Sequence, residues 1–101
     1  MEDVMNASLS EIFKVLSDDN RLKIVLIVAK GKMCANEILG EIGISQPTLS
    51  HHMKVLTDAG LVSSTKVGTQ VHYELNRSKV SCLCHFVREI SGKKPCSLEE
   101  N

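Results

Sequence analysis

Apolar residues recur every three or four positions over the first 59 residues and predict four consecutive helices. Ser8 or Ser10 is expected to cap the first helix, whose apolar face contains Leu9, Ile12, Phe13 and Leu16. Short polar side chains at residues 17–20 end it, because they can satisfy free backbone N–H groups. A second helix over residues 21–30 then ends at Gly31. Its apolar positions are Leu22, Val25, Leu26 and Ala29, although its β-branched run would also fit a buried strand.

The third and fourth helices are predicted to be joined by a very short turn. The third covers residues 35–42 and is broken by Gly43, and the fourth covers residues 46–59. Ser45 is a favourable N-cap for the fourth helix, and Pro47 fits its first turn because no N–H is needed there. This connection has the length and the glycine of a helix-turn-helix. The inward positions are Ile38, Leu39 and Ile42, followed by Leu49, Met53 and Leu56.

After Gly60 the apolar period changes from helical to two, which is typical of a half-buried strand. Residues 61–66 and 70–75 are predicted to form a hairpin that turns at residues 67–69. A last helix over residues 78–91 carries Val80, Leu83, Val87 and Ile90 on one side. The predicted fold is therefore mainly helical with a small β-hairpin, in the order α-α-α-α-β-β-α. We expect one domain over residues 1–92 and a flexible tail over residues 93–101.

The composition is that of an ordinary globular protein and indicates no particular partner. The 101 residues are 43% hydrophobic and 24% charged, which is ordinary for a water-soluble globular domain. Twelve basic and twelve acidic residues give zero net charge, so net charge indicates neither nucleic acid nor membrane. The longest apolar run, residues 24–29, is far shorter than the ~20 residues of a membrane span. The acidic N-terminus lacks the basic and apolar regions of a signal peptide. We expect a cytoplasmic protein with reduced thiols, and no motif predicts an enzyme.

Three segments resemble one family. LGEIGISQPTLSHHMKVLTDAGLV, at residues 39–62, resembles the recognition segment of the ArsR/SmtB family of bacterial repressors. VLSDDNRLKIVLIV, at residues 15–28, is similar to that family's first helix junction, and SSTKVGTQVHYEL, at residues 63–75, resembles its wing. The resemblance implies a winged helix-turn-helix homodimer. It also implies binding to a palindromic double-stranded DNA operator, which is released when an inducer binds.

The start of the fourth helix has side chains suited to reading DNA. A recognition helix presents its N-terminal residues to base edges in the major groove, and phosphate contacts fix its position. The candidates for base edges are Gln46, Thr48, Ser50, His51 and His52, with Lys54 placed for a phosphate. At the hairpin turn, Lys66, Thr69 and Gln70 are candidates for the neighbouring backbone or minor groove. The alternative is a solvated helix start with no DNA role.

The cysteines are candidate ligands for an inducer. Cys82, Cys84 and Cys96 lie near the C-terminus, and thiolates favour Zn, Cd or a trivalent metalloid. Cys82 and Cys84 point about 200° apart on a regular helix, so both cannot chelate one ion. Either the helix unwinds locally, or each thiol works with a different partner. The family's arsenic or cadmium site in the third helix has two cysteines, whereas only Cys34 stands there, as a possible contributor. We expect no obligatory cofactor and an inducer of the arsenite or antimonite type, with Cd or Zn as alternatives.

Two other functions remain open at this point. The same repressor could use its thiols as a redox or polysulfide switch, or the chain could be a winged-helix module that binds another protein and no DNA. Separately, the cysteines could simply be small buried hydrophobic residues.

Overall fold

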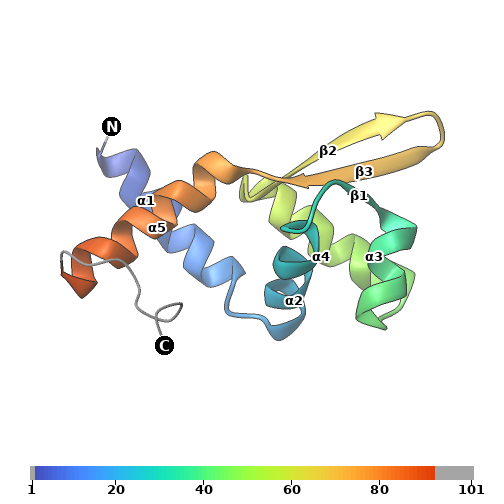
Figure 1. Ribbon diagram of the computed structural model, residues 1–101, viewed down its shortest axis with the longest axis horizontal. Coiled ribbons are helices and arrows are strands. Elements are labelled where there is room, and N and C mark those ends of the chain that lie inside the picture. The colour runs from blue at the N-terminus through green and yellow to red at the C-terminus, as the bar shows by residue number, and fades with distance from the viewer. Residues whose placement is uncertain (1, 93–101) are drawn as a thin grey trace.

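The computed structural model describes the backbone of residues 2–92 and the side chains of residues 9–92. This part of the chain forms five helices and three strands (Figure 1). They are α1 (Glu2–Val15), α2 (Asp19–Val28), β1 (Met33–Cys34), α3 (Ala35–Ile42), α4 (Gln46–Asp58), β2 (Val62–Val67), β3 (Gln70–Leu75) and α5 (Arg77–Ser91). The predicted order of helices and hairpin is confirmed, with one additional short strand. The predicted tail at residues 93–101, and with it Cys96, lies outside the described residues.

Side-chain caps determine where α2 and α4 begin. The Asp18 carboxylate accepts hydrogen bonds from the backbone N–H groups of Asn20 and Arg21, at 2.8 and 3.1 Å, so α2 starts two residues earlier than predicted. Ser45 Oγ accepts from the Thr48 N–H at 3.3 Å and confirms the predicted cap of α4. Gly43, with φ +73°, ends α3 in a left-handed conformation that suits glycine. Two helices thus meet across a three-residue turn.

The predicted start of the first helix is wrong. Helix α1 begins at Glu2, so Ser8 and Ser10 both lie inside it and neither caps it. No glycine or proline occurs between residues 2 and 15, and polar residues are tolerated on a helix surface. Polar side chains alone therefore do not mark a helix start.

The predicted apolar face of α2 is wrong at Leu22 and Leu26, whereas its other two members, Val25 and Ala29, pack partly buried against the core. Ile24, Ile27 and Val28 are buried, with Ile24 0% exposed, whereas Leu22 and Leu26 face outward and Leu26 is 70% exposed. Both sets have helical spacing, so the periodicity fits either face. The choice follows from packing, because α2 contacts α3, α4 and β3 through the Ile24 side.

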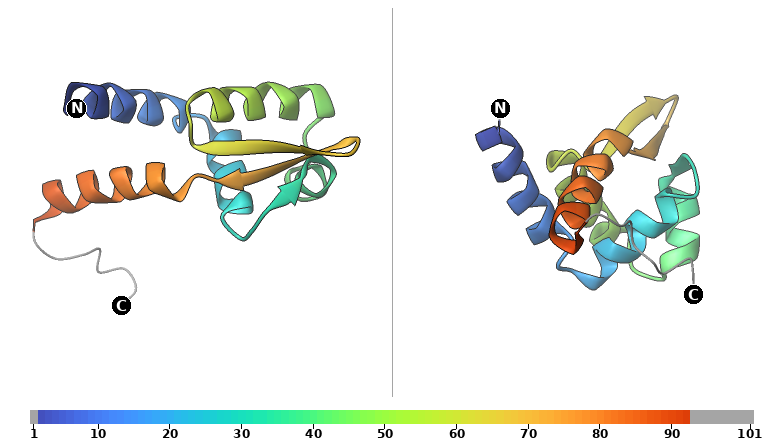
Figure 2. Two further views of the ribbon diagram at one scale, coloured as in Figure 1. Left: turned by 90° about the horizontal axis from the view of Figure 1, so that it is seen from above. Right: turned by 60° about the vertical axis from the view of Figure 1, so that its left-hand side comes forward.

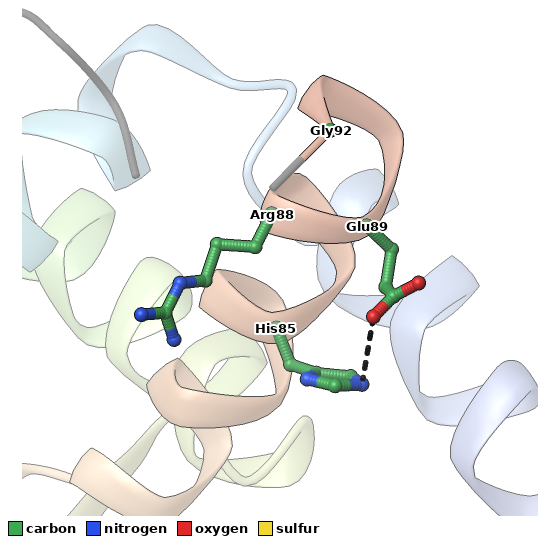
Figure 3. Close-up of a pocket in the computed structure, with 4 residues that line it drawn as sticks. All are labelled: His85, Arg88, Glu89 and Gly92. Atoms are coloured by element: carbon green, nitrogen blue, oxygen red, sulfur yellow. Dashed lines mark ion pairs between the residues drawn. The ribbon is translucent and has the colours of Figure 1, made fainter. Parts of the chain in front are cut away.

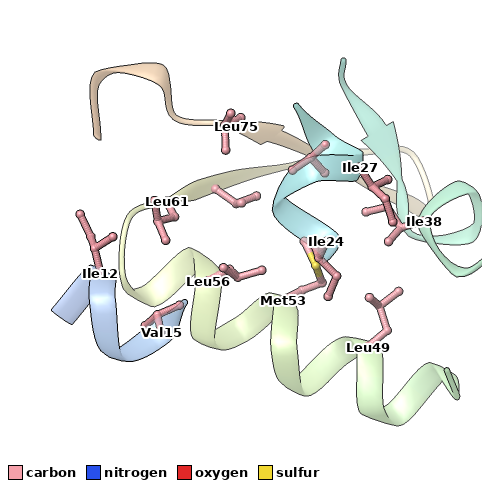
Figure 4. Packing of buried hydrophobic residues seen from close by; sticks show 12 residues of the cluster. Ile12, Val15, Ile24, Ile27, Ile38, Leu49, Met53, Leu56, Leu61 and Leu75 are labelled. Atoms are coloured by element: carbon pink, nitrogen blue, oxygen red, sulfur yellow. The ribbon is translucent and has the colours of Figure 1, made fainter. Parts of the chain in front are cut away.

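One aliphatic core joins the helices to the hairpin. Its members come from α1 to α4, from β2 and β3, and from the residue before β2, as Figure 4 shows. Met53 is part of this core as predicted, and Met33 packs against it partly buried. The buried cluster consists of Ile12, Val15, Ile24, Ile27, Val28, Ile38, Leu49, Met53, Leu56, Leu61, Val62 and Leu75.

The sheet is antiparallel, with strand order β1-β3-β2. Val62 pairs with Leu75 and Val67 with Gln70, which leaves a two-residue turn at Gly68 and Thr69. Gly68 has φ +64°, a conformation expected in such a tight turn. The hairpin runs alongside α4 (Figure 2), while β1 pairs Met33 with Tyr73. A strand of two residues has no period, so the sequence pattern could not reveal β1.

Helices α1 and α5 lie next to each other at the end of the molecule away from the hairpin turn (Figures 1 and 2). The Phe13 and Phe86 rings meet edge to face, with their centroids 5.6 Å apart. On α5, Val80 and Leu83 pack against the core, but Val87 and Ile90 are exposed. Of its predicted apolar face, the described residues therefore cover only the N-terminal half. No helix among the described residues is long and apolar enough to cross a membrane.

The assignment of the inward face of α2 can be tested by a matched pair of substitutions. Ile24→Ala should lower the free energy of unfolding by about 2–5 kcal/mol, because it leaves a cavity in the core. Leu26→Ala should change it by less than about 0.5 kcal/mol, because that side chain is mostly in water. Urea denaturation of both variants measures the difference, and equal losses would contradict the assigned face.

Candidate nucleic-acid interface

Helix α4 has one buried face and one exposed polar face. Leu49, Met53 and Leu56 point into the core. The exposed side chains include most of the predicted base-reading residues and the predicted phosphate contact, namely Gln46, Thr48, Ser50, His51 and Lys54. The structure therefore brings five of the six predicted residues of this helix to the solvent. An exposed helix that follows a short turn has the geometry needed to enter a major groove.

The hairpin turn lies beside the start of α4. Gln46 and Ser50 line a groove of about 270 Å³ together with Thr69 and Gln70 of the hairpin. The groove also includes Cys34 and Asn36 at the start of α3, and Tyr73 of β3. Lys66 is exposed on β2, one residue before the end of the strand. Predicted residues from two distant segments thus share one surface, and donors and acceptors from both line it.

Lys54 has a partner on its own helix. Its Nζ lies 3.3 Å from Asp58 Oδ2, one turn further on, and both side chains are exposed. An exposed ion pair of this kind contributes little to stability, since water screens it. Lys54 can therefore exchange Asp58 for another anion at small cost.

His52 does not lie with the exposed residues of α4. Its side chain is only 7% exposed, and its Nδ1 is 3.0 Å from Nη1 of Arg21 on α2. Residues 49, 52, 53 and 56 follow the spacing i, i+3, i+4, i+7, which places His52 on the buried stripe. That spacing is the signal that could have separated His52 from His51 before the structure was known. The sequence did not predict that Arg21 is its partner.

The carboxylate that caps α2 is held in its charged form. Two backbone N–H groups, Arg21 first and then Asn20, donate to Asp18 and lower the pKa of this carboxyl below its usual 3.8. The positive charge of Arg21 acts in the same direction. The loop between α1 and α2 is therefore fixed by a carboxylate at neutral pH.

The predicted thiol ligands among the described residues differ in burial and lie on two different helices or their caps. On α5, Cys82 is half-buried and Cys84 is exposed, while Cys34 is buried at the start of α3. The backbone N–H of Cys34 donates to Glu37 Oε1 at 2.9 Å, which lowers the pKa of Glu37. Within residues 9–92 no group of three or more His, Cys, Asp or Glu side chains could hold a metal ion. A site at Cys82 or Cys84 would need ligands from elsewhere.

An exposed, weak ion pair lies on α5 (Figure 3). His85 Nε2 is 3.8 Å from Glu89 Oε2, and both side chains are about 70% exposed. These two residues line a shallow depression of about 440 Å³ with Arg88 and Gly92. His85 is thus a surface residue.

An exposed helix after a three-residue turn, with a β-hairpin at its side, defines the class of winged helix-turn-helix regulatory proteins. A family model described as "Bacterial regulatory protein, arsR family" matches residues 18–64. The arsenical resistance operon repressor of Staphylococcus aureus is 47% identical over 70 residues, covering 69% of this chain and 67% of that protein. The chain belongs to the ArsR family, so the resemblance seen in the sequence is confirmed.

Two further comparisons agree with this assignment. The cadmium resistance transcriptional regulatory protein CadC of Listeria innocua is 42% identical over 74 residues, covering 72% of this chain and 62% of that protein. The crystal structure of the transcriptional repressor BigR from Xylella fastidiosa matches with a TM-score of 0.70 and 28% identity, over 92% of this chain and 95% of that one. The chain spans about two thirds of the length of the two resistance regulators.

The pKa of Asp18 predicts a specific pH dependence of stability. Asp18→Asn keeps a capping side chain but removes the charge, so the variant should be less stable than the natural protein near neutral pH. A carboxyl whose pKa is lowered by folding stabilises the fold above its unfolded pKa, and loses that contribution as pH falls through the folded value. The gap in melting temperature should therefore close below about pH 3.8. A gap that stays constant from pH 7 to pH 3 would contradict this assignment.

Proposed function

We propose that the protein is a homodimeric transcriptional repressor that binds a palindromic operator and releases it when a thiophilic metal or metalloid binds. The observation that carries the DNA-binding part is the exposed polar face of α4 beside the hairpin turn. Membership of the ArsR family supports the regulatory part. The proposal gives no residue a catalytic role.

Residues of the exposed face of α4 and of the hairpin have separate roles in the proposed complex. Side chains with amide, hydroxyl or imidazole groups read base edges, and basic side chains contact phosphates. The proposed base-reading residues are Gln46, Thr48, Ser50 and His51, and Lys54 contacts a phosphate. The hairpin residues Lys66, Thr69 and Gln70 contact the adjacent backbone or minor groove. The burial of His52 argues for a different role, on the inner side of α4.

A second copy of the chain is the proposed partner of α1 and α5. Phe13 on α1, with Val87 and Ile90 on α5, leaves apolar surface in water, and Ile90 is 68% exposed. Exposed apolar residues grouped on two adjacent helices favour association over the monomer. A two-fold dimer presents two copies of α4, which matches a palindromic site.

Operator binding can be tested by one substitution on α4 and one on the hairpin. Gln46→Ala should lower operator affinity by about 1–3 kcal/mol, and should do so much less on unrelated DNA, because it removes a base contact. Lys66→Ala should weaken binding to both and reduce the slope of log affinity against log salt by about one. Fluorescence anisotropy over a range of KCl concentrations measures both effects. If the natural protein fails to bind its own upstream region even at low salt, the protein-interaction hypothesis gains support instead.

The proposed inducer site uses the thiols of Cys82, Cys84 and Cys96, with Cys34 as a possible contributor. Thiolates select soft ions, and the 47% identical relative is named for arsenical resistance, so arsenite or antimonite is proposed ahead of Cd and Zn. Cys82 and Cys84 lie on the helix that also carries the exposed apolar residues Val87 and Ile90. An ion bound there would act on the proposed dimer surface and so on the spacing of the two α4 helices.

Inducer release can be measured on the preformed operator complex. Arsenite or antimonite should weaken operator binding by roughly 5- to 150-fold, the usual range of allosteric coupling. The triple variant Cys82→Ser, Cys84→Ser, Cys96→Ser should bind DNA normally and lose this response, with Cys34→Ser as the comparison. Cd and Zn are titrated in parallel. Release of the triple variant by the same ions would rule out the thiol site.

A thiol redox or polysulfide switch is the second candidate for the signal. Mass spectrometry separates it from metal binding, because a bound ion adds its own mass whereas a disulfide removes two hydrogens. Release by polysulfide with no release by any of the four ions would favour the switch.

A further inference from the structure

One guanidinium group links three helices. Arg21 lies in the first turns of α2, and its Nε donates a hydrogen bond to the backbone carbonyl of Val15, the last residue of α1, at 2.7 Å. Its Nη1 lies 3.0 Å from Nδ1 of His52 in the middle of α4. The backbone N–H of Arg21 is itself held by the Asp18 carboxylate. The end of α1, the start of α2 and the inner side of α4 therefore meet at this side chain.

The donor and the acceptor of the hydrogen bond between Arg21 and His52 follow from the chemistry of the two groups. A guanidinium has only donors, so His52 Nδ1 must be the acceptor and the ring proton must lie on Nε2. The two donors belong to one planar group with fixed angles between them, which sets the direction of the His52 ring relative to the Val15 carbonyl. A lysine has the same charge but no such fork, and cannot fix both partners in this way.

The position of His52 on α4 makes the contact relevant to the exposed face. His52 follows Ser50 and His51, two of the proposed base-reading residues, and its own side chain lies on the opposite, buried face. A contact that fixes the buried side of a helix also fixes its rotation about its axis. Small rotations matter at a nucleic acid, because hydrogen bonds to base edges weaken steeply with angle.

We propose that Arg21 is a positioning residue for DNA recognition, which acts through His52 and does not itself contact the operator. This proposal rests on the function proposed above. Core packing decides which face of α4 is buried, and the guanidinium holds the finer rotation of α4 relative to the end of α1, which belongs to the proposed dimer surface. Loss of the link should therefore reduce recognition of the operator more than general attraction to DNA.

Three substitutions test this role. Arg21→Lys keeps the charge and removes the fork, while His52→Leu removes the acceptor and keeps a large buried side chain. His52→Asn retains an acceptor near the position of Nδ1. Lys23→Ala is the matched control, because it removes one charge from the exposed face of the same helix. Affinity for the operator and for an unrelated duplex is measured by fluorescence anisotropy. The temperature is one at which circular dichroism shows that each variant is folded.

We expect Arg21→Lys and His52→Leu to bind the operator about tenfold more weakly than the natural protein, with little change on the unrelated duplex. His52→Asn should recover most of the operator affinity. A purely structural contribution would lower the melting temperature without changing the ratio of the two affinities in the folded state. Lys23→Ala shows how much the loss of one charge alone changes both duplexes.

Three results would overturn the proposal. If Arg21→Lys binds the operator like the natural protein, the charge alone matters and Arg21 is a phosphate contact. If His52→Asn and His52→Leu behave alike, the acceptor has no role. If the natural protein itself does not distinguish the operator from the unrelated duplex, the proposed function fails, and the positioning role fails with it.

Discussion

The burial of one stripe of α4 is the constraint on which the rest of the structure depends. Leu49, Met53 and Leu56 are almost completely removed from water against α2 and the hairpin. Burying each such side chain is worth about 1.5–3 kcal/mol, so rotating α4 would cost several of these contributions at once. Because that stripe must face inward, the polar side of the helix must face the solvent. The candidate DNA-reading surface is therefore a consequence of core packing.

Helix α2 connects this surface to the other end of the molecule. At its start, Arg21 joins His52 of α4, and at its end the carbonyl of Ala29 accepts a hydrogen bond from Arg77, the first residue of α5, at 3.0 Å. Its middle packs into the core through Ile24, Ile27 and Val28. Helix α2 and its C-terminal cap thus contact both the helix proposed to read DNA and the helix that carries Cys82 and Cys84. This arrangement provides a continuous physical route between them.

The two ends of the molecule differ in what they expose. Around α4 and the hairpin turn the exposed side chains are mostly polar, which suits contact with a hydrated, charged partner. On α1 and α5 the aromatic pair Phe13 and Phe86 lies next to the exposed Val87 and Ile90. Such surface is better matched to another apolar surface than to water. The proposed DNA contact and the proposed dimer contact therefore lie on separate parts of the chain.

The sequence by itself determined the elements whose signals are local. The Ser45 cap, the Gly43 break, the alternation of residues 70–75 and the spacing of Leu49, Met53 and Leu56 predicted the helix-turn-helix and the hairpin, because each depends on neighbouring residues. Only the tertiary structure decided between the two apolar stripes of α2, revealed the two-residue strand β1, and placed His52 beside Arg21, 31 residues away. Those outcomes depend on contacts between distant segments, which the spacing of residues within one segment does not encode.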